Sequence, residues 1–314
     1  MGPPWRPDRC FWRGGESAAT LVGVDSTYLY WSTTTALRRI PTAGGTPSTV
    51  STVSLQQYNV SLDTSNPGGT ALVWTSGPFG QAQLLTAPIA TLLANGTPTV
   101  LASQSMGGLA GNPSGPSADA TSVFFFMGSG SQMQRTSSVA MVAKRPPGSM
   151  VVDLTDGGGP GNLGGPQLAL VDSTSVYWTN DQGIWQVPKG GGVPPALVVS
   201  GGSLGVNGGL AADATNVYYS DQVSGSVVRV DKSTLSAVQL AVAQSPYAVA
   251  TDGQNVYWSN AGAGGISRIA SCSTSVPCGA TPRIVVDGTL VASMLVDAVN
   301  VYWAGQGAVW ELAK

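Results

Sequence analysis

Aspartates recur along this chain at the same place in a repeated pattern. Each one follows a short apolar run and precedes an aromatic segment such as Val176-Tyr177-Trp178. The positions are Asp25, Asp63, Asp119, Asp172, Asp213, Asp252 and Asp297. Carboxylates can bind a hard cation or transfer protons. A residue that is needed once per repeat is better explained by structure, so we expect each Asp to accept backbone N–H groups in the turn that follows it.

The amino-acid composition excludes several other kinds of catalytic site. The chain contains no histidine, which excludes Ser-His-Asp and Cys-His machinery as well as His-ligated metals. The chain has two glutamates, Glu16 and Glu311, and neither stands at the start of the first predicted strand of a repeat. We therefore expect no enzyme here, with the question left open for metal-dependent chemistry.

Three cysteines are present, Cys10, Cys272 and Cys278. The last two lie six residues apart in a loop with Pro277, and two thiols without histidine do not provide the roughly four ligands of a zinc site. This spacing predicts a Cys272–Cys278 disulfide, which favours an oxidising compartment: extracellular, periplasmic or cell envelope. Cys10 is expected to be a free thiol. The first residues contain no apolar signal region.

Charge and hydropathy remove two classes of partner. Charged residues make up 10% of the chain and the net charge is -2, so no basic surface for nucleic acid is expected. Apolar runs stay well below the roughly 20 residues that span a bilayer. We expect neither nucleic-acid binding nor membrane insertion.

The elements that carry these residues are short strands. Each repeat contains an apolar run, the aromatic segment, a strand such as 184–187 and a further apolar run such as 196–199, joined by Gly- and Pro-rich turns. No segment holds a helical period. Four strands in a repeat of roughly 40 residues are typical of a β-propeller blade. The sequence predicts an all-β, seven-bladed β-propeller of four antiparallel strands per blade, formed by a single domain over residues 1–314.

Large aromatic residues are expected to fill the space between blades, because a lone four-stranded sheet cannot bury both faces. Val176 and Trp178 share one strand face, and Tyr177 takes the other. The residues expected between blades are Trp31, Trp74, Trp178, Trp258 and Trp303. The last repeat lacks a fourth strand, so a strand around Phe11 and Trp12 is expected to complete it and close the ring.

The repeats also carry a resemblance to a known family. VYWTN at 176–180 and VYWSN at 256–260, with a following Gly-Ile, resemble YWTD-type (LDL-receptor class B-like) propeller repeats and their bacterial relatives. Asn180 and Asn260 stand where the family motif ends in Asp, and Asp221 is nearest to that pattern. The resemblance implies the fold, since such repeats serve receptors, scaffolds and exported proteins alike.

Polar residues near the aromatic strands are the candidate binding residues. The loops that enter the first strand of a blade contribute Asn112, Asn162 and Asn207, and the turns after the aromatic strand contribute Asn180, Asp181, Gln182, Asp221, Gln222, Asn260 and Gln306. Polar, weakly charged groups beside aromatic rings suit sugars or peptides; the alternative is that these are solvated turn residues.

Three functions remain open from the sequence. The first is a non-catalytic, exported binding scaffold, expected to be monomeric, that recognises a carbohydrate, peptide or protein partner at the channel mouth. The second is a metal-dependent hydrolase like the propeller lactonases, with Ca²⁺ held in the central channel by Asp and Asn. The third is a structural cell-envelope protein. No other cofactor is expected.

Overall fold

The structure is a computed structural model in which the described residues form two compact units. The first unit contains Val22–Thr42 and Thr46–Ser200; the second contains Met1–Leu21, Ala43–Gly45 and Gly201–Lys314. Each is considered by itself. The described residues are 9–13, 19–52, 60–77, 81–103, 112–128, 136–155, 169–180, 182–200, 209–242, 245–261, 267–288, 291–305 and 307–314.

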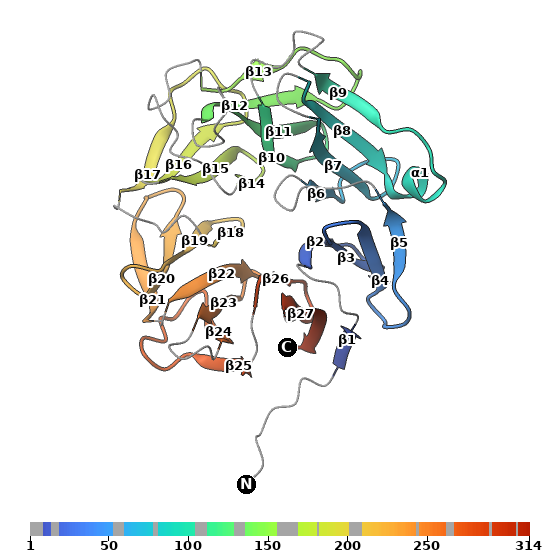
Figure 1. The fold of residues 1–314 in the computed structure, drawn as a ribbon. Coiled ribbons are helices and arrows are strands. Elements are labelled where there is room, and N and C mark those ends of the chain that lie inside the picture. Colours follow the sequence, from blue (N-terminus) through green and yellow to red (C-terminus); the bar gives the residue numbers. More distant parts are fainter. Residues whose placement is uncertain are drawn as a thin grey trace. The chain divides into compact units, whose positions relative to one another are not determined.

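The first unit contains four antiparallel sheets, apart from the start of β2 (Figure 1). Sheet one comprises β2 (Thr20–Val24), β3 (Tyr28–Ser32), β4 (Leu37–Pro41) and β5 (Ser48–Ser51). Sheet two comprises β6 (Val60–Asp63), β7 (Ala71–Ser76), β8 (Gln83–Pro88) and β9 (Thr99–Ser103). Sheet three comprises β10 (Asn112–Ala118), β11 (Ser122–Gly128), β12 (Thr136–Ala143) and β13 (Val152–Asp153). Sheet four comprises β14 (Ala169–Val171), β15 (Ser175–Asn180), β16 (Gly183–Pro188) and β17 (Ala196–Ser200).

The second unit contains three more sheets of the same kind. Sheet five comprises β18 (Leu210–Ala212), β19 (Asn216–Asp221), β20 (Ser226–Asp231) and β21 (Ala237–Val242). Sheet six comprises β22 (Pro246–Thr251), β23 (Asn255–Ala261), β24 (Ser267–Ser273) and β25 (Arg283–Asp287). Sheet seven comprises β26 (Ser293–Val296), β27 (Asn300–Gly305), β28 (Ala308–Ala313) and β1 (Arg9–Arg13).

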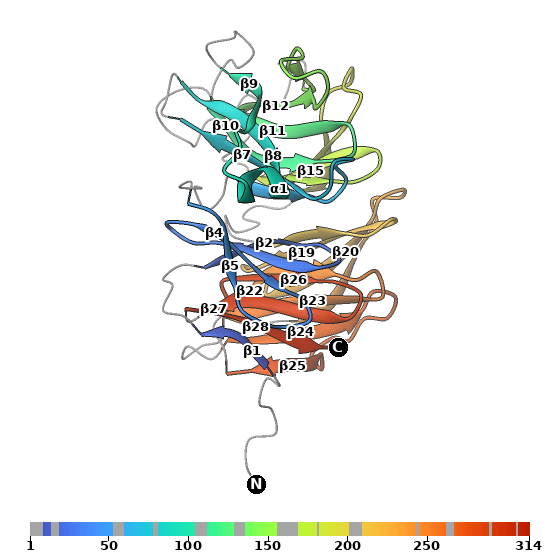
Figure 2. The same cartoon turned by 90° about the vertical axis from the view of Figure 1, so that its right-hand side faces the viewer.

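Every sheet has the strand order of a propeller blade, and the fold class predicted from the sequence, a seven-bladed β-propeller, is confirmed. The predicted closing strand is confirmed as well. In sheet seven, β1 pairs antiparallel with β28, with Cys10 opposite Trp310 and Arg13 opposite Ala308. Figure 2 shows β1 beside β28 in the second unit. This pairing covers the edge of β28, which would otherwise present unpaired backbone groups.

The aromatic strands pack as their alternation predicts. Trp178 is fully buried and shares a hydrophobic cluster with Phe124 and Phe126 of the preceding sheet. Trp258 meets Tyr218 of sheet five in the same way. The predicted tryptophans at 31, 74, 178, 258 and 303 are each at most 2% exposed. Burying rings of this size supplies much of the apolar contact between blades.

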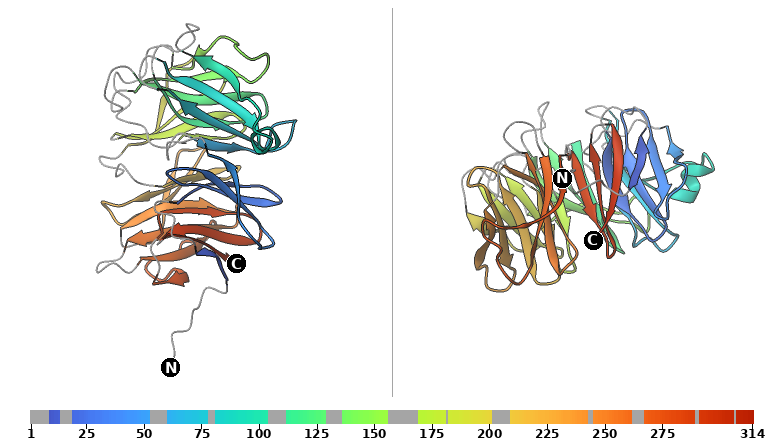
Figure 3. Two further views of the ribbon diagram at one scale, coloured as in Figure 1. Left: turned by 45° about the vertical axis from the view of Figure 1, so that its right-hand side comes forward. Right: turned by 90° about the horizontal axis from the view of Figure 1, so that it is seen from below.

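The expectation that no segment is helical was wrong at one place. Residues Ile89–Leu93 form a short α-helix, α1, between β8 and β9 (Figure 1). Pro88 precedes it with φ -55°, and Ile89 and Leu92 are its buried residues. One turn is too short to show a 3.6-residue period, so the sequence pattern could not indicate it. Elsewhere in the described residues strands dominate every view, including those of Figure 3.

Among the described residues, no helix is long and apolar enough to cross a membrane.

Candidate functional site

The repeated aspartates form the turns between the first and second strands of the blades. Oδ1 of Asp213 accepts hydrogen bonds from the backbone N–H groups of Thr215 and Asn216, both at 2.8 Å. The same pair of bonds recurs at Asp25, Asp119, Asp172, Asp252 and Asp297. Asp63 accepts the N–H of Ser65 at 3.1 Å. The predicted role of these residues in the turn is confirmed.

The second carboxylate oxygen receives a tyrosine hydroxyl from the aromatic strand. The Tyr302 hydroxyl donates to Asp297 Oδ2 at 2.8 Å, and Tyr257 donates to Asp252 Oδ2 at 3.1 Å. Tyr30 and Tyr218 make the equivalent bonds to Asp25 and Asp213. The tyrosine stands five residues after its Asp. The side chain of each of these aspartates therefore links the turn to the strand that follows it.

A lysine from the next blade reaches three of these carboxylates. Lys144 Nζ lies 2.5 Å from Asp63 Oδ2, Lys189 Nζ lies 2.7 Å from Asp119 Oδ2, and Lys314 Nζ lies 2.5 Å from Asp252 Oδ2. Each lysine follows the third strand of its blade, where its backbone N–H also bonds to the Asp-led turn of its own blade. The repeat pattern does not predict this inter-blade contact, although the sequence carries a signal for it: a lysine at a fixed place after the third strand.

Hydrogen bonds and ion pairs of this kind lower the pKa of Asp25, Asp119, Asp213 and Asp252. Burial tends to raise the pKa of Asp119, but the hydrogen bond from Lys189 and the turn N–H groups outweigh it and lower that pKa to about 2. The pKa values of Asp25, Asp213 and Asp252 are also lowered, against the effect of burial, by their hydrogen bonds. An acid that is ionised well below neutral pH does not serve as a proton donor at pH 7.

The contact between the first and second sheets differs from the three contacts that contain a lysine. Ile89 occupies the place of the lysine, and the Thr70 hydroxyl donates to Asp25 Oδ2 at 2.8 Å instead. A shallow hollow of about 250 Å³ opens there, and its lining includes Tyr28 and Arg39. The Arg39 guanidinium lies 4.1 Å from the centre of the Tyr28 ring. All four acceptor positions of Asp25 are used by neighbouring donors.

The candidate binding residues lie at the other ends of the second strands. Asn180 is 5% exposed, and its Oδ1 accepts the N–H of Gln182, the N–H of Gly183 and the Trp185 indole N–H. Asn260 is 8% exposed at the equivalent place in sheet six. Both asparagines are therefore buried, and Asn180 in particular shapes its own turn.

The accessible candidates are fewer. Gln182 is exposed, while Asp221 and Gln222 are partly exposed at the end of β19. Asp221 Oδ1 accepts the N–H groups of Val223 and Ser224. The structure thus places Asp221, Gln222 and Asn260 on neighbouring sheets of the second unit and Asn180 and Gln182 in the first. The backbone of Asn112 lies in β10; its side chain and residues Asn162, Asp181, Asn207 and Gln306 lie outside what the structure describes.

Among the described residues, no group of three or more His, Cys, Asp or Glu side chains is arranged to hold a metal ion. Glu311 is 8% exposed and accepts a hydrogen bond from Asn300 Nδ2 at 2.6 Å. Within that part of the chain, the repeat carboxylates accept hydrogen bonds from tyrosine, lysine and backbone donors.

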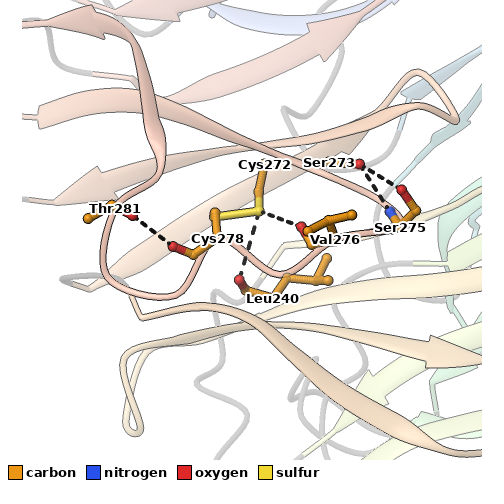
Figure 4. The surroundings of a disulfide bond; sticks show 7 residues. All are labelled: Leu240, Cys272, Ser273, Ser275, Val276, Cys278 and Thr281. Carbon is orange, nitrogen blue, oxygen red and sulfur yellow. Dashed lines mark hydrogen bonds between the residues drawn. A yellow bond between two sulfur atoms is a disulfide. The ribbon is translucent and has the colours of Figure 1, made fainter.

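The predicted disulfide between Cys272 and Cys278 is confirmed (Figure 4). Its Cα atoms lie 5.9 Å apart, within the range that a bridge requires. Cys272 is buried on β24 and Cys278 is partly exposed. The side chain of Cys10 lies outside the described residues, so its free state stays a prediction.

Comparison with known proteins supports the fold. No protein-family model and no curated sequence matches the chain. A chain of the nidogen/laminin complex is 18% identical with a TM-score of 0.56, covering 83% of this chain and 93% of that one. Streptogramin B lyase is 10% identical with a TM-score of 0.66, covering 95% and 93%. A chain of the mitotic checkpoint complex is 10% identical with a TM-score of 0.68, covering 100% and 97%. At these identities the likeness shows the fold alone.

Proposed function

We propose that this chain is a non-catalytic, exported binding propeller of the YWTD-like type. The observation that carries the proposal is the use of the repeat carboxylates. Each repeated Asp is engaged by turn N–H groups, and most also hold a tyrosine hydroxyl or a cation from the next blade. Groups committed in this way stabilise the scaffold and leave ligand recognition to other residues.

The recognition surface in this proposal is the turn after β19 in the second unit. Gln222 offers an accessible side-chain amide there. Uncharged donors and acceptors suit glycan hydroxyls or the backbone of an extended peptide, whereas a basic surface would suit nucleic acid. The partner class is therefore a carbohydrate, peptide or protein, bound by a monomer.

Export is supported by the disulfide. A bond between Cys272 and Cys278 persists in an oxidising compartment and is reduced in most cytosols. The proposed location is extracellular, periplasmic or in the cell envelope.

An array of glycans and peptides probed with the purified protein tests this function. We expect retained ligands to lose at least about ten-fold in affinity with Gln222→Ala, the size of one lost polar contact. Gln254→Ala is the matched control, because Gln254 is an exposed glutamine in an Asp-led turn at the opposite strand end. Retention of no ligand would favour a structural envelope protein. Calcium-dependent lactone hydrolysis would replace the proposal with the hydrolase.

A further inference from the structure

The loop that contains the disulfide makes backbone contacts with a neighbouring blade. The N–H groups of Cys278 and Gly279 donate to Leu240 O, at 2.8 and 3.1 Å, and the N–H of Val242 donates to Gly279 O at 2.9 Å. Ala241 and Gly279 form a parallel bridge. Leu240 and Val242 belong to β21 of sheet five, whereas the loop connects β24 to β25 of sheet six.

This contact covers a sheet edge. β21 is the last strand in the order β18-β19-β20-β21, so its outer side has no strand partner within sheet five. The edge of a sheet presents free N–H and C=O groups that can pair with another chain. Residues 278–279 satisfy two of these groups, Leu240 O and Val242 N.

The disulfide anchors the covering segment to the interior. Cys272 is 5% exposed and shares a hydrophobic cluster with Leu240, Ala241 and Trp258. Its Sγ lies 3.8 Å from Leu240 O and 3.4 Å from Val276 O (Figure 4). The bond to Cys278 therefore fixes the pairing segment to a buried point beside β21.

Besides the disulfide, the segment is held by its backbone bonds to β21, by two bonds from Thr281 to Cys278 O and by packing of Cys278 on the cluster; the rest of it is open to solvent. Val276 is 63% exposed, and Pro277 and Gly279 are exposed as well. Gly279 has φ +58°, a conformation that glycine adopts readily, and a Cβ there would meet no atom within 4 Å. A backbone hydrogen bond contributes little net stability, and these bonds must offset the entropy lost on ordering the loop.

We propose that the Cys272–Cys278 disulfide is a reducible latch that holds the 278–279 segment on the edge of the fifth blade and releases that edge when a dithiol reduces it. A thiolate of the dithiol attacks Sγ of the partly exposed Cys278, and Cys272 leaves and takes a proton. The second thiol of the dithiol then attacks the reductant's sulfur in the mixed disulfide. Cys278 leaves and takes a proton, and the dithiol is released in its oxidised form. The buried Cys272 thiol has Leu240 O and Val276 O within reach as hydrogen-bond acceptors, so the reduced state leaves no buried donor unpaired.

Hydrogen exchange of the whole chain tests the latch, with dithiothreitol as the reductant. On reduction we expect the amide of Val242 to exchange at least about ten-fold faster, as local opening without global unfolding requires. Amides of the interior strand β20 should keep their protection and serve as the control. The Cys272→Ser/Cys278→Ser protein should match the reduced wild type without any reductant.

Gly279→Ala separates the disulfide from the backbone pairing. The substitution strains the left-handed residue without filling occupied space. With the disulfide intact, we expect faster exchange at Val242 and faster reduction by dithiothreitol than in the wild type. Unchanged exchange at Val242 after reduction would overturn the latch, as would resistance of the folded protein to dithiothreitol. Loss of protection in β20 on reduction would also overturn it, because the bond would then maintain the fold of the sheet. These residues are separate from the proposed binding turns, so either proposal can fail alone.

Discussion

Lys144 of the third blade places its Nζ 2.5 Å from Oδ2 of Asp63 in the second, and these side chains are 8% and 1% exposed. The same relationship joins Lys189 to Asp119, with side chains 18% and 25% exposed. Both pairs link one blade to the next, and they differ chiefly in burial. Comparing the two pairs shows how strongly burial of an inter-blade ion pair affects its contribution to stability.

Replacing each lysine by methionine gives a matched comparison. Lys144→Met leaves the Asp63 carboxylate buried without its partner, so we expect a loss of about 3 to 5 kcal/mol in the free energy of unfolding. Lys189→Met acts on a more solvated pair and should cost about 1 kcal/mol or less. Urea unfolding of both variants measures this, and equal losses would contradict the role assigned to burial.

The pH dependence of stability follows from Asp119. Its pKa in the folded protein is about 2, below the ordinary aspartate value of 3.8, so ionisation of this group favours the folded state at neutral pH. That contribution is present above the unfolded pKa and is lost as the pH falls from about 4 toward 2. In Lys189→Met, NMR titration should show a higher pKa for Asp119. An unchanged titration would mean that the turn N–H groups alone set it.

An alkaline loss of stability is expected from the tyrosines. Burial and then repulsion from Asp252 raise the pKa of Tyr257 to about 12, from the ordinary tyrosine value of 10.0. The neutral hydroxyl is the form that the fold favours, so its contribution is complete below pH 10 and is lost between about 10 and 12. Tyr257→Phe should show a shallower fall in stability over that window. An identical fall in the variant would assign the loss to other groups.

The tryptophans between blades should be costly to remove. Trp178→Ala or Trp258→Ala deletes a fully buried ring, and we expect each to cost about 3 to 5 kcal/mol. Chemical denaturation followed by circular dichroism measures the loss. A cost below about 1 kcal/mol for both would mean that the cavity closes without penalty, against the packing seen here.

Deleting residues 1–13 removes β1 and uncovers the edge of β28. We expect a lower melting temperature and self-association, because an open edge pairs with other chains. Light scattering after size exclusion detects the association. A monomeric protein with an unchanged melting temperature would show that β1 contributes no closure.

Closure of the last sheet by β1 could be predicted because the last repeat lacks a fourth strand. The other parts of the structure that sequence could predict are those set by near neighbours. Asp213 and its turn donors lie two and three residues apart, and Trp178 follows strand alternation, so local chemistry determined both. The Lys144–Asp63 contact spans 81 residues and exists only where two blades meet. The pairing of Gly279 with Ala241 likewise depends on the packing of two blades.

The sequence determines less of the candidate site, for a related reason. Asn180 is buried, and its Oδ1 accepts the Trp185 indole N–H and two turn N–H groups. The residue type of a polar turn position is the same whether its side chain contacts solvent, a ligand or its own backbone. Exposure, which separates Gln182 from Asn180, is not determined by the repeat pattern.

The contacts of the repeat carboxylates indicate that these groups brace the blades, and we propose that they bind no metal. Thermal unfolding of the wild type and of Asp252→Asn, each with calcium and with a chelator, tests this. We expect calcium to leave the wild-type melting temperature unchanged. We also expect Asp252→Asn to lower that temperature by at least about 2 °C in both conditions, because Lys314 loses its partner. A calcium-dependent rise in the wild type that disappears in Asp252→Asn would contradict the claim.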